Sequence, residues 1–135
     1  MLTATVDVTA AELKNLLAAP KQIVPAPGAG KAIALITGFI NYLHVTTPYT
    51  VPSPGSLMIG APATAIYAYQ LFQAGGILDD TQNYLITAED QPQGSLSADV
   101  TNAPLVLGFT GATDLTVGDG TARVTVGYIV VDILS

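Results

Sequence analysis

Residues 115–133 read LTVGDGTARVTVGYIVVDI, and this stretch carries the clearest fold signal in the chain. Two apolar segments, Leu115–Val117 and Ala122–Ile133, flank Gly118-Asp119-Gly120, and glycine at such a connection permits the positive φ angles that tight hairpins need. We therefore predict a C-terminal β-hairpin. Alternation with period two puts four residues of its second strand on one face, the core face: Val124, Val126, Tyr128 and Val130.

The opposite face of this last strand changes character along its length. It begins polar with Arg123 and Thr125 and becomes apolar at Ile129, Val131 and Ile133. A strand that already has a core face needs a partner for a second apolar face. We therefore predict that the end of this strand contacts another subunit, through Ile129, Val131 and Ile133.

Upstream of the hairpin the sequence again favours β-structure. Residues 32–45 are apolar on both alternating faces, which predicts a strand that is covered on both sides or bent at Gly38. One face would hold Phe39 with Ile33, and the other Ile36 with Ile40. Glycine- and proline-rich turns separate further short strands, predicted at residues 57–59, 64–72, 83–87, 96–100 and 104–109. The fold class predicted from this pattern is all-β, a jelly-roll-like β-sandwich with one short N-terminal helix.

The helix is predicted near the N-terminus. Thr9-Ala10-Ala11-Glu12 matches a capping box, and Pro20 ends the segment. Two to three helical turns are too short to be stable alone, so their apolar side should dock on something. That side consists of Leu13, Leu16 and Leu17, which either bind a neighbouring subunit or cover one open end of the sandwich. Residues 1–135 would form a single domain, with residues 1–20 as its N-terminal arm and short helix.

Composition narrows the function classes. Charged residues make up 10% of the chain, against roughly 25% in typical soluble proteins, while mean hydropathy is +0.49. No apolar run reaches the roughly 18 residues of a spanning helix, and no basic segment marks a signal peptide, so we expect no membrane partner. The net charge of −6 argues against nucleic acid. A surface with so few charges is typical of proteins that pack against other proteins.

Signals for chemistry are weak, so we expect neither an enzyme nor a cofactor or metal. Gly28-Ala29-Gly30-Lys31 lacks the remaining residues of a phosphate-binding loop. His44, the only histidine, would have to support any hydrolase, and no Gly-x-Ser-x-Gly elbow accompanies it. The acidic pairs Asp79-Asp80 and Glu89-Asp90 fit solvated turns better than a calcium loop. A carbohydrate-binding module is the main alternative function, carried by the loop at 46–56 and by tyrosines, namely Tyr49, Tyr67 and Tyr69.

Both ends of the chain resemble small structural proteins of tailed bacteriophages. At the N-terminal end the resemblance rests on the leucine-containing segment 13–19 followed by Pro20-Lys21-Gln22-Ile23-Val24-Pro25-Ala26-Pro27-Gly28-Ala29-Gly30-Lys31. In the second half it rests on residues 102–107, NAPLVL, and on residues 118–128, GDGTARVTVGY. It implies a capsid decoration or cement protein on the virion surface, a homotrimer whose partner is the major capsid protein.

Overall fold

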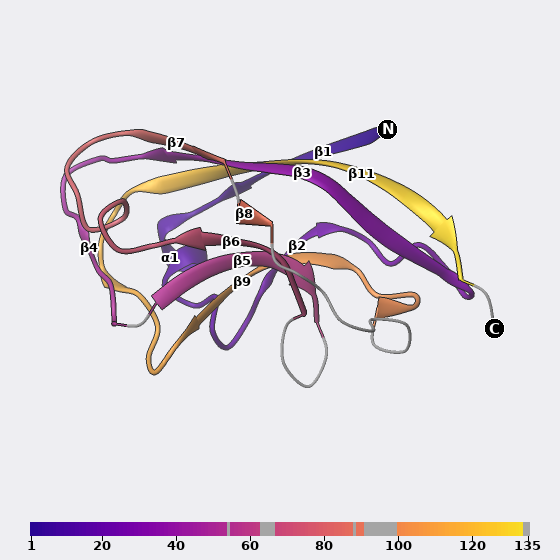
Figure 1. The fold of residues 1–135 in the computed structure, drawn as a ribbon. Helices are drawn as coiled ribbons and strands as arrows, with labels where there is room; N and C mark the ends of the chain where they lie inside the picture. The colour runs from indigo at the N-terminus through magenta and orange to yellow at the C-terminus, as the bar shows by residue number, and fades with distance from the viewer. Residues whose placement is uncertain (54, 63–66, 88, 91–99, 134–135) are drawn as a thin grey trace.

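The computed structural model describes residues 1–53, 55–62, 67–87, 89–90 and 100–133 and shows two facing antiparallel sheets (Figure 1). The first sheet has the order β1 (Leu2–Val8), β11 (Thr121–Asp132), β3 (Lys31–Leu43), β7 (Tyr84–Thr87). The second sheet has the order β2 (Lys21–Val24), β9 (Leu105–Gly111), β5 (Gly55–Ala61), β6 (Tyr67–Gln73), β8 (Glu89–Asp90). A small third sheet pairs β10 (Thr116–Val117) with β4 (Tyr49–Thr50), and α1 spans Ala10–Leu13.

The strand order is that of a jelly roll. Eight of the described strands are four residues or longer, and four of them form each main sheet. Counted along the chain, these eight are arranged as 1-8-3-6 in the first sheet and 2-7-4-5 in the second. Two four-stranded sheets built from eight antiparallel strands are the jelly-roll architecture. The prediction of an all-β, jelly-roll-like sandwich with one short helix is therefore confirmed.

Alternation along the strands builds the core between the two sheets. Ile40, Val124 and Val126 of the first sheet are fully buried, and so are Ile59 and Leu107 of the second. Four of their sequence neighbours on the first sheet, namely Phe39, Asn41, Arg123 and Thr125, point away from the core and remain accessible to solvent. One sheet thus keeps an outer face that the described part of the chain leaves largely uncovered.

The N-terminus departs from the predicted arm, because residues 2–8 form strand β1. This strand pairs with β11 from Leu2 opposite Tyr128 to Val8 opposite Ala122. Period-two alternation of Leu2, Ala4, Val6 and Val8 was the available sequence signal for it.

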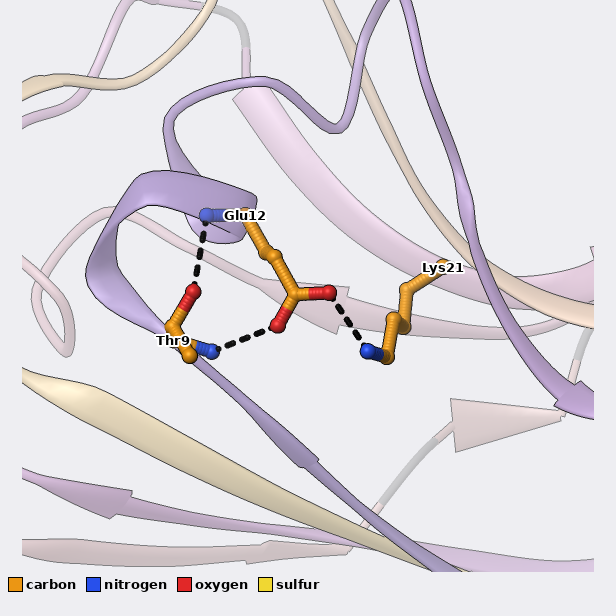
Figure 2. Close-up of polar contacts among 3 residues, drawn as sticks. All are labelled: Thr9, Glu12 and Lys21. Atoms are coloured by element: carbon orange, nitrogen blue, oxygen red, sulfur yellow. Dashed lines mark hydrogen bonds and ion pairs between the residues drawn. The ribbon is translucent and has the colours of Figure 1, made fainter.

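The capping box is confirmed, but the helix it starts is shorter than predicted. The Thr9 amide donates to Glu12 Oε1 over 3.0 Å, and the Glu12 amide donates to Thr9 Oγ1 over 3.2 Å. Glu12 also accepts from Lys21 Nζ at the start of β2 (Figure 2). Within residues 9–20 only Ala10–Leu13 is α-helical, and turns follow to residue 18. This segment places Leu13 and Leu16 in the chain's own core.

The predicted C-terminal hairpin is wrong in its pairing. Strand β11 is present, but β10 pairs with β4 and not with β11. The physical cause lies in the segment around Tyr49, since the Asp119 carboxylate accepts from the amides of Thr46 and Thr47 and the Tyr49 hydroxyl donates to the Gly120 carbonyl. These contacts hold the Gly118-Asp119-Gly120 turn against a segment about 70 residues earlier in the chain.

The remaining predicted strands have mixed outcomes. Those at 57–59, 83–87 and 104–109 correspond to β5, β7 and β9, and the long apolar strand corresponds to β3. The strand predicted at 64–72 overlaps β6, although residues 63–66 lie outside the described chain. Residues 96–99 of the strand predicted at 96–100 lie outside it too, and the remaining residue, Val100, is helical and not part of a strand. Strand β3 is covered on both sides only at its start, where Ala32 and Ile33 are both buried, and among the described residues its outer face is open at Phe39, Asn41 and Leu43. Its pairing with β11 shifts register at Gly127/Tyr128, close to the expected bend at Gly38.

Candidate functional surface

The outer face of the first sheet is an uncovered surface on which several exposed apolar side chains of the described strands gather. It consists of the outward-pointing side chains of β1, β11, β3 and β7, centred on Phe39, Asn41, Leu85, Arg123 and Thr125. Leu85 is 73% exposed, Leu43 51% and Phe39 36%. In Figure 1 this sheet forms the upper layer, and no described strand or helix lies over it. Exposed apolar residues gathered on one face indicate a binding surface.

Strand register arranges these residues in rows across the sheet. One row runs from Asp7 through Arg123 and Asn41 to Leu85. The next row runs from Thr5 through Thr125 and Phe39 to Thr87. Large apolar side chains therefore stand on β3 and β7, while β1 and β11 carry threonines and one ion pair.

The two rows form a shallow, open depression of about 330 Å³, lined by the five central residues of the outer face. A second depression of about 520 Å³ adjoins it and shares Asn41 and Arg123. The surface is thus gently hollowed and not a deep cleft. Such a shape suits a protein surface or an extended ligand better than a small enclosed substrate.

One ion pair sets the electrostatics of the outer face. Arg123 binds Asp7 in a bidentate manner, with Nε to Oδ1 at 2.6 Å and Nη2 to Oδ2 at 3.1 Å. This hydrogen bonding lowers the pKa of the Asp7 carboxyl and raises the pKa of Arg123. The pair is solvent-exposed, so it contributes little to stability, but it leaves this face with balanced charge.

The other three cationic side chains are also engaged within the chain. Lys14 Nζ donates to the carbonyls of Val117 and Gly118, Lys21 pairs with Glu12, and Lys31 pairs with Asp132 at 2.7 Å. Since the whole sequence has four Lys and Arg residues, no cation remains unengaged. The surplus of negative charge therefore falls on carboxylates, and several of them lie in loops.

The predicted interface residues differ in how far the structure buries them. Leu13 and Leu16 are wrong as interface residues, because both are completely buried in the main core. Val131 and Ile133 are half-buried against a small second cluster formed by Ala32, Ala61 and Val100. Leu17 and Ile129 remain exposed, and by alternation Ile129 belongs to the outer face.

Sequence reasoning missed Phe39 and Leu85. Simple alternation placed Phe39 on the same face as Ile33, which is a core residue. The register shift opposite Gly127 and Tyr128 inserts an extra residue in β3, so the two side chains end on opposite faces. Leu85 lies opposite Asn41, and only the pairing of β7 with β3 reveals that it extends the same surface.

Most residues proposed for carbohydrate or phosphate binding are not available for that role in the structure. Tyr49 is buried, its hydroxyl donates to Gly120, and burial raises its pKa, so it cannot stack on a sugar. The side chains of Tyr67 and Tyr69 lie outside what the structure describes. Gly28 and Gly30 adopt positive φ in a turn, and the following Lys31 is paired with Asp132, which fits a turn and not a phosphate loop.

His44 lies near two carboxylates but in no triad that the described residues form. Its Nδ1 is buried and has no hydrogen-bond partner there. Asp80 is engaged by the Tyr84 hydroxyl and the Thr81 amide, and Asp119 by the amides of Thr47 and Thr46. These hydrogen bonds lower the pKa of both carboxyls, with a smaller contribution from His44. The carboxylates therefore hold loops in place.

No family model, curated protein or solved structure matches this chain. Within the described ranges, no group of three or more His, Asp or Glu side chains is placed to hold a metal ion. No helix in that same part of the chain is long and apolar enough to cross a membrane.

Proposed function

We propose that this chain is a structural protein of a bacteriophage virion, a capsid decoration or cement protein that binds between major capsid protein subunits on the capsid surface. The observation that carries the proposal is the outer face, an exposed apolar surface on a protein with very few charges. Such a surface serves contacts between proteins and offers nothing for catalysis. The resemblance of residues 13–31 and 118–128 to phage structural proteins supplies the biological setting.

The physical properties of the chain suit that role. A protein that binds only the assembled shell stabilises the shell by mass action. Many copies on a repeating lattice gain avidity even when each contact is weak. A net charge of −6 with every cation engaged also keeps the chain from binding the packaged genome. Jelly rolls occur in viral capsid proteins and also in lectins, so the fold is compatible with the proposal without deciding it.

Shell binding tests the proposal directly. Purified protein would be mixed with capsids of the encoding phage prepared without it, and the pelleted shells would be imaged by electron microscopy. We expect added density at regular lattice positions and greater resistance of the shells to heat. Shells that pellet without the protein, at every concentration tested, would contradict the proposal.

A carbohydrate-binding module remains the second candidate, and the outer face gives it a new location. Phe39, Asn41 and the Arg123–Asp7 pair line the two adjoining depressions, which provides an aromatic ring beside hydrogen-bonding groups. Glycan-array binding that Phe39→Ala abolishes and Tyr49→Phe preserves would favour this candidate. An array without any bound glycan would exclude the sugars it displays.

A further inference from the structure

We infer that the outer face of the first sheet packs against the same face of a second copy of this chain, giving a two-fold dimer. The inference concerns the free protein and does not depend on the virion role. Because the second copy covers the face that is proposed above to bind the shell, shell binding through this face would require the dimer to dissociate. The dimer also differs from the trimer that the resemblance implies, because two identical faces in mutual contact close after two chains.

The dimensions of the outer face fit such a contact. Strands β3 and β11 are 13 and 12 residues long, which corresponds to about 40 Å at roughly 3.3 Å per residue. The flanking strands β1 and β7 are shorter, with 7 and 4 residues, so the four strands, about 4.8 Å apart, together cover roughly 570 Å². Two such faces in contact would bury about 1,100 Å² in total, just above the roughly 1,000 Å² that a specific protein interface needs.

The relief of the face is complementary to itself. Most of its large apolar side chains, Leu43, Phe39 and Leu85, stand on β3 and β7. The opposite half, on β1 and β11, carries the shorter side chains of Thr5 and Thr125, which share a hydrogen bond of 3.2 Å. The Asp7–Arg123 ion pair lies beside them, and one large apolar side chain, Ile129, stands further along β11. A two-fold axis that runs along the strands would place the raised half of one copy over the low half of the other. Facing sheets in sandwiches pack about 10 Å apart in this way.

Charge favours a second copy over other occupants. The only charged side chains that the described strands place on this face are Asp7 and Arg123, which neutralise each other. Two copies can therefore meet here without opposing free carboxylates, although the chain as a whole carries −6. A basic partner would gain more from the acidic loops around Asp79 and Asp119, and an anionic surface would be repelled by the net charge. A neutral, partly apolar face is best matched by its own copy.

Sedimentation velocity between roughly 1 and 100 µM tests the dimer, a range chosen to span ordinary association constants. The test variants are Phe39→Thr with Leu85→Thr, which removes the raised apolar side chains, and Thr125→Lys, which places a charge at the centre of the face. The control is Val117→Thr, a 59% exposed valine on β10, outside the outer face. Circular dichroism and urea unfolding of every variant report whether the fold is intact.

We expect the unmodified chain and Val117→Thr to sediment as two chains. Both test variants should sediment as single chains of 13.8 kDa with the native circular dichroism spectrum. Lysine can extend into solvent from a strand surface, so Thr125→Lys should keep the monomer fold. This variant therefore still tests the dimer if the double variant unfolds. An unmodified chain that is monomeric or trimeric throughout would overturn the inference, and so would a Thr125→Lys variant that dimerises like the unmodified chain.

Discussion

Replacing Leu16 by alanine separates a core leucine from an interface leucine. Leu16 is completely buried within a single chain, whereas the adjacent Leu17 is 40% exposed. Removing a fully buried leucine side chain forfeits about 1.5–3 kcal/mol of transfer free energy, and the cavity brings typical losses to about 2–5 kcal/mol. We expect Leu16→Ala to lower the free energy of unfolding by about 3 kcal/mol on that basis. Leu17→Ala should change it by no more than about 0.5 kcal/mol.

Urea unfolding followed by circular dichroism measures both variants. With a urea m-value of about 2 kcal/mol per molar, a loss of 3 kcal/mol lowers the unfolding midpoint by about 1.5 M. Leu17→Ala is a matched control because the hydrogen bond at that position runs from the Leu17 amide to Asp114 and does not involve the side chain. Equal midpoints for the two variants would refute the placement of Leu16 in the core. A Leu16→Ala variant with native stability but a changed oligomeric mass in solution would instead place Leu16 in a subunit interface.

Three further predictions concern caps, turns and pH. Thr9→Ala removes a capping-box hydrogen bond and should lower the free energy of unfolding by about 1 kcal/mol. Thr9→Ser keeps the hydroxyl and should retain most of that free energy. Equal losses of unfolding free energy in the two variants would contradict the role of Thr9 as a cap. Gly118→Ala would place a Cβ 2.2 Å from the Tyr49 ring at φ +34°. Its urea midpoint should therefore fall further than that of Gly75→Ala, whose Cβ would meet nothing within 4 Å at a φ outside the left-handed region. The reverse order would be inconsistent with the structure. Hydrogen bonds lower the folded-state pKa of Glu12 and Asp119, so on acidification the unfolded chain takes up protons before the folded chain does. The urea midpoint should therefore be steady above about pH 5 and fall below it. A urea midpoint that rises on acidification would contradict these contacts.

The fold class was predictable because its main signal is local. Alternation of apolar residues in β11 and the glycine- and proline-rich turns indicate an antiparallel sandwich without knowledge of which strand pairs with which. The same alternation in residues 2–8 is a local signal for β1, although the capping box directly after it indicates a helix. The capping box itself was correctly located, since it depends on residues three positions apart.

Pairing was not predictable, because it depends on contacts between segments far apart in sequence. The Gly118-Asp119-Gly120 turn has the composition of a hairpin, yet Asp119 binds the amides of Thr46 and Thr47 and directs the chain to β4. No local pattern reports this contact.

The candidate surface was missed for a related reason. The register shift opposite Gly127 moves Phe39 from the expected face to the other one, and a single inserted residue leaves no mark in hydropathy. Leu13 and Leu16 illustrate a different limit. An amphipathic segment has the same sequence pattern whether it packs on its own chain or on a neighbour, so only the structure could assign both residues to the core.

The claim that another protein surface covers the outer face can be measured on the unmodified chain. Hydroxyl-radical footprinting read by mass spectrometry would compare Phe39 and Leu85 with Val117 in dilute solution and in concentrated or shell-bound samples. We expect the modification of Phe39 and Leu85 to fall severalfold on association, whereas that of Val117 stays constant. Modification of all three residues at the same relative rates in every sample would contradict it.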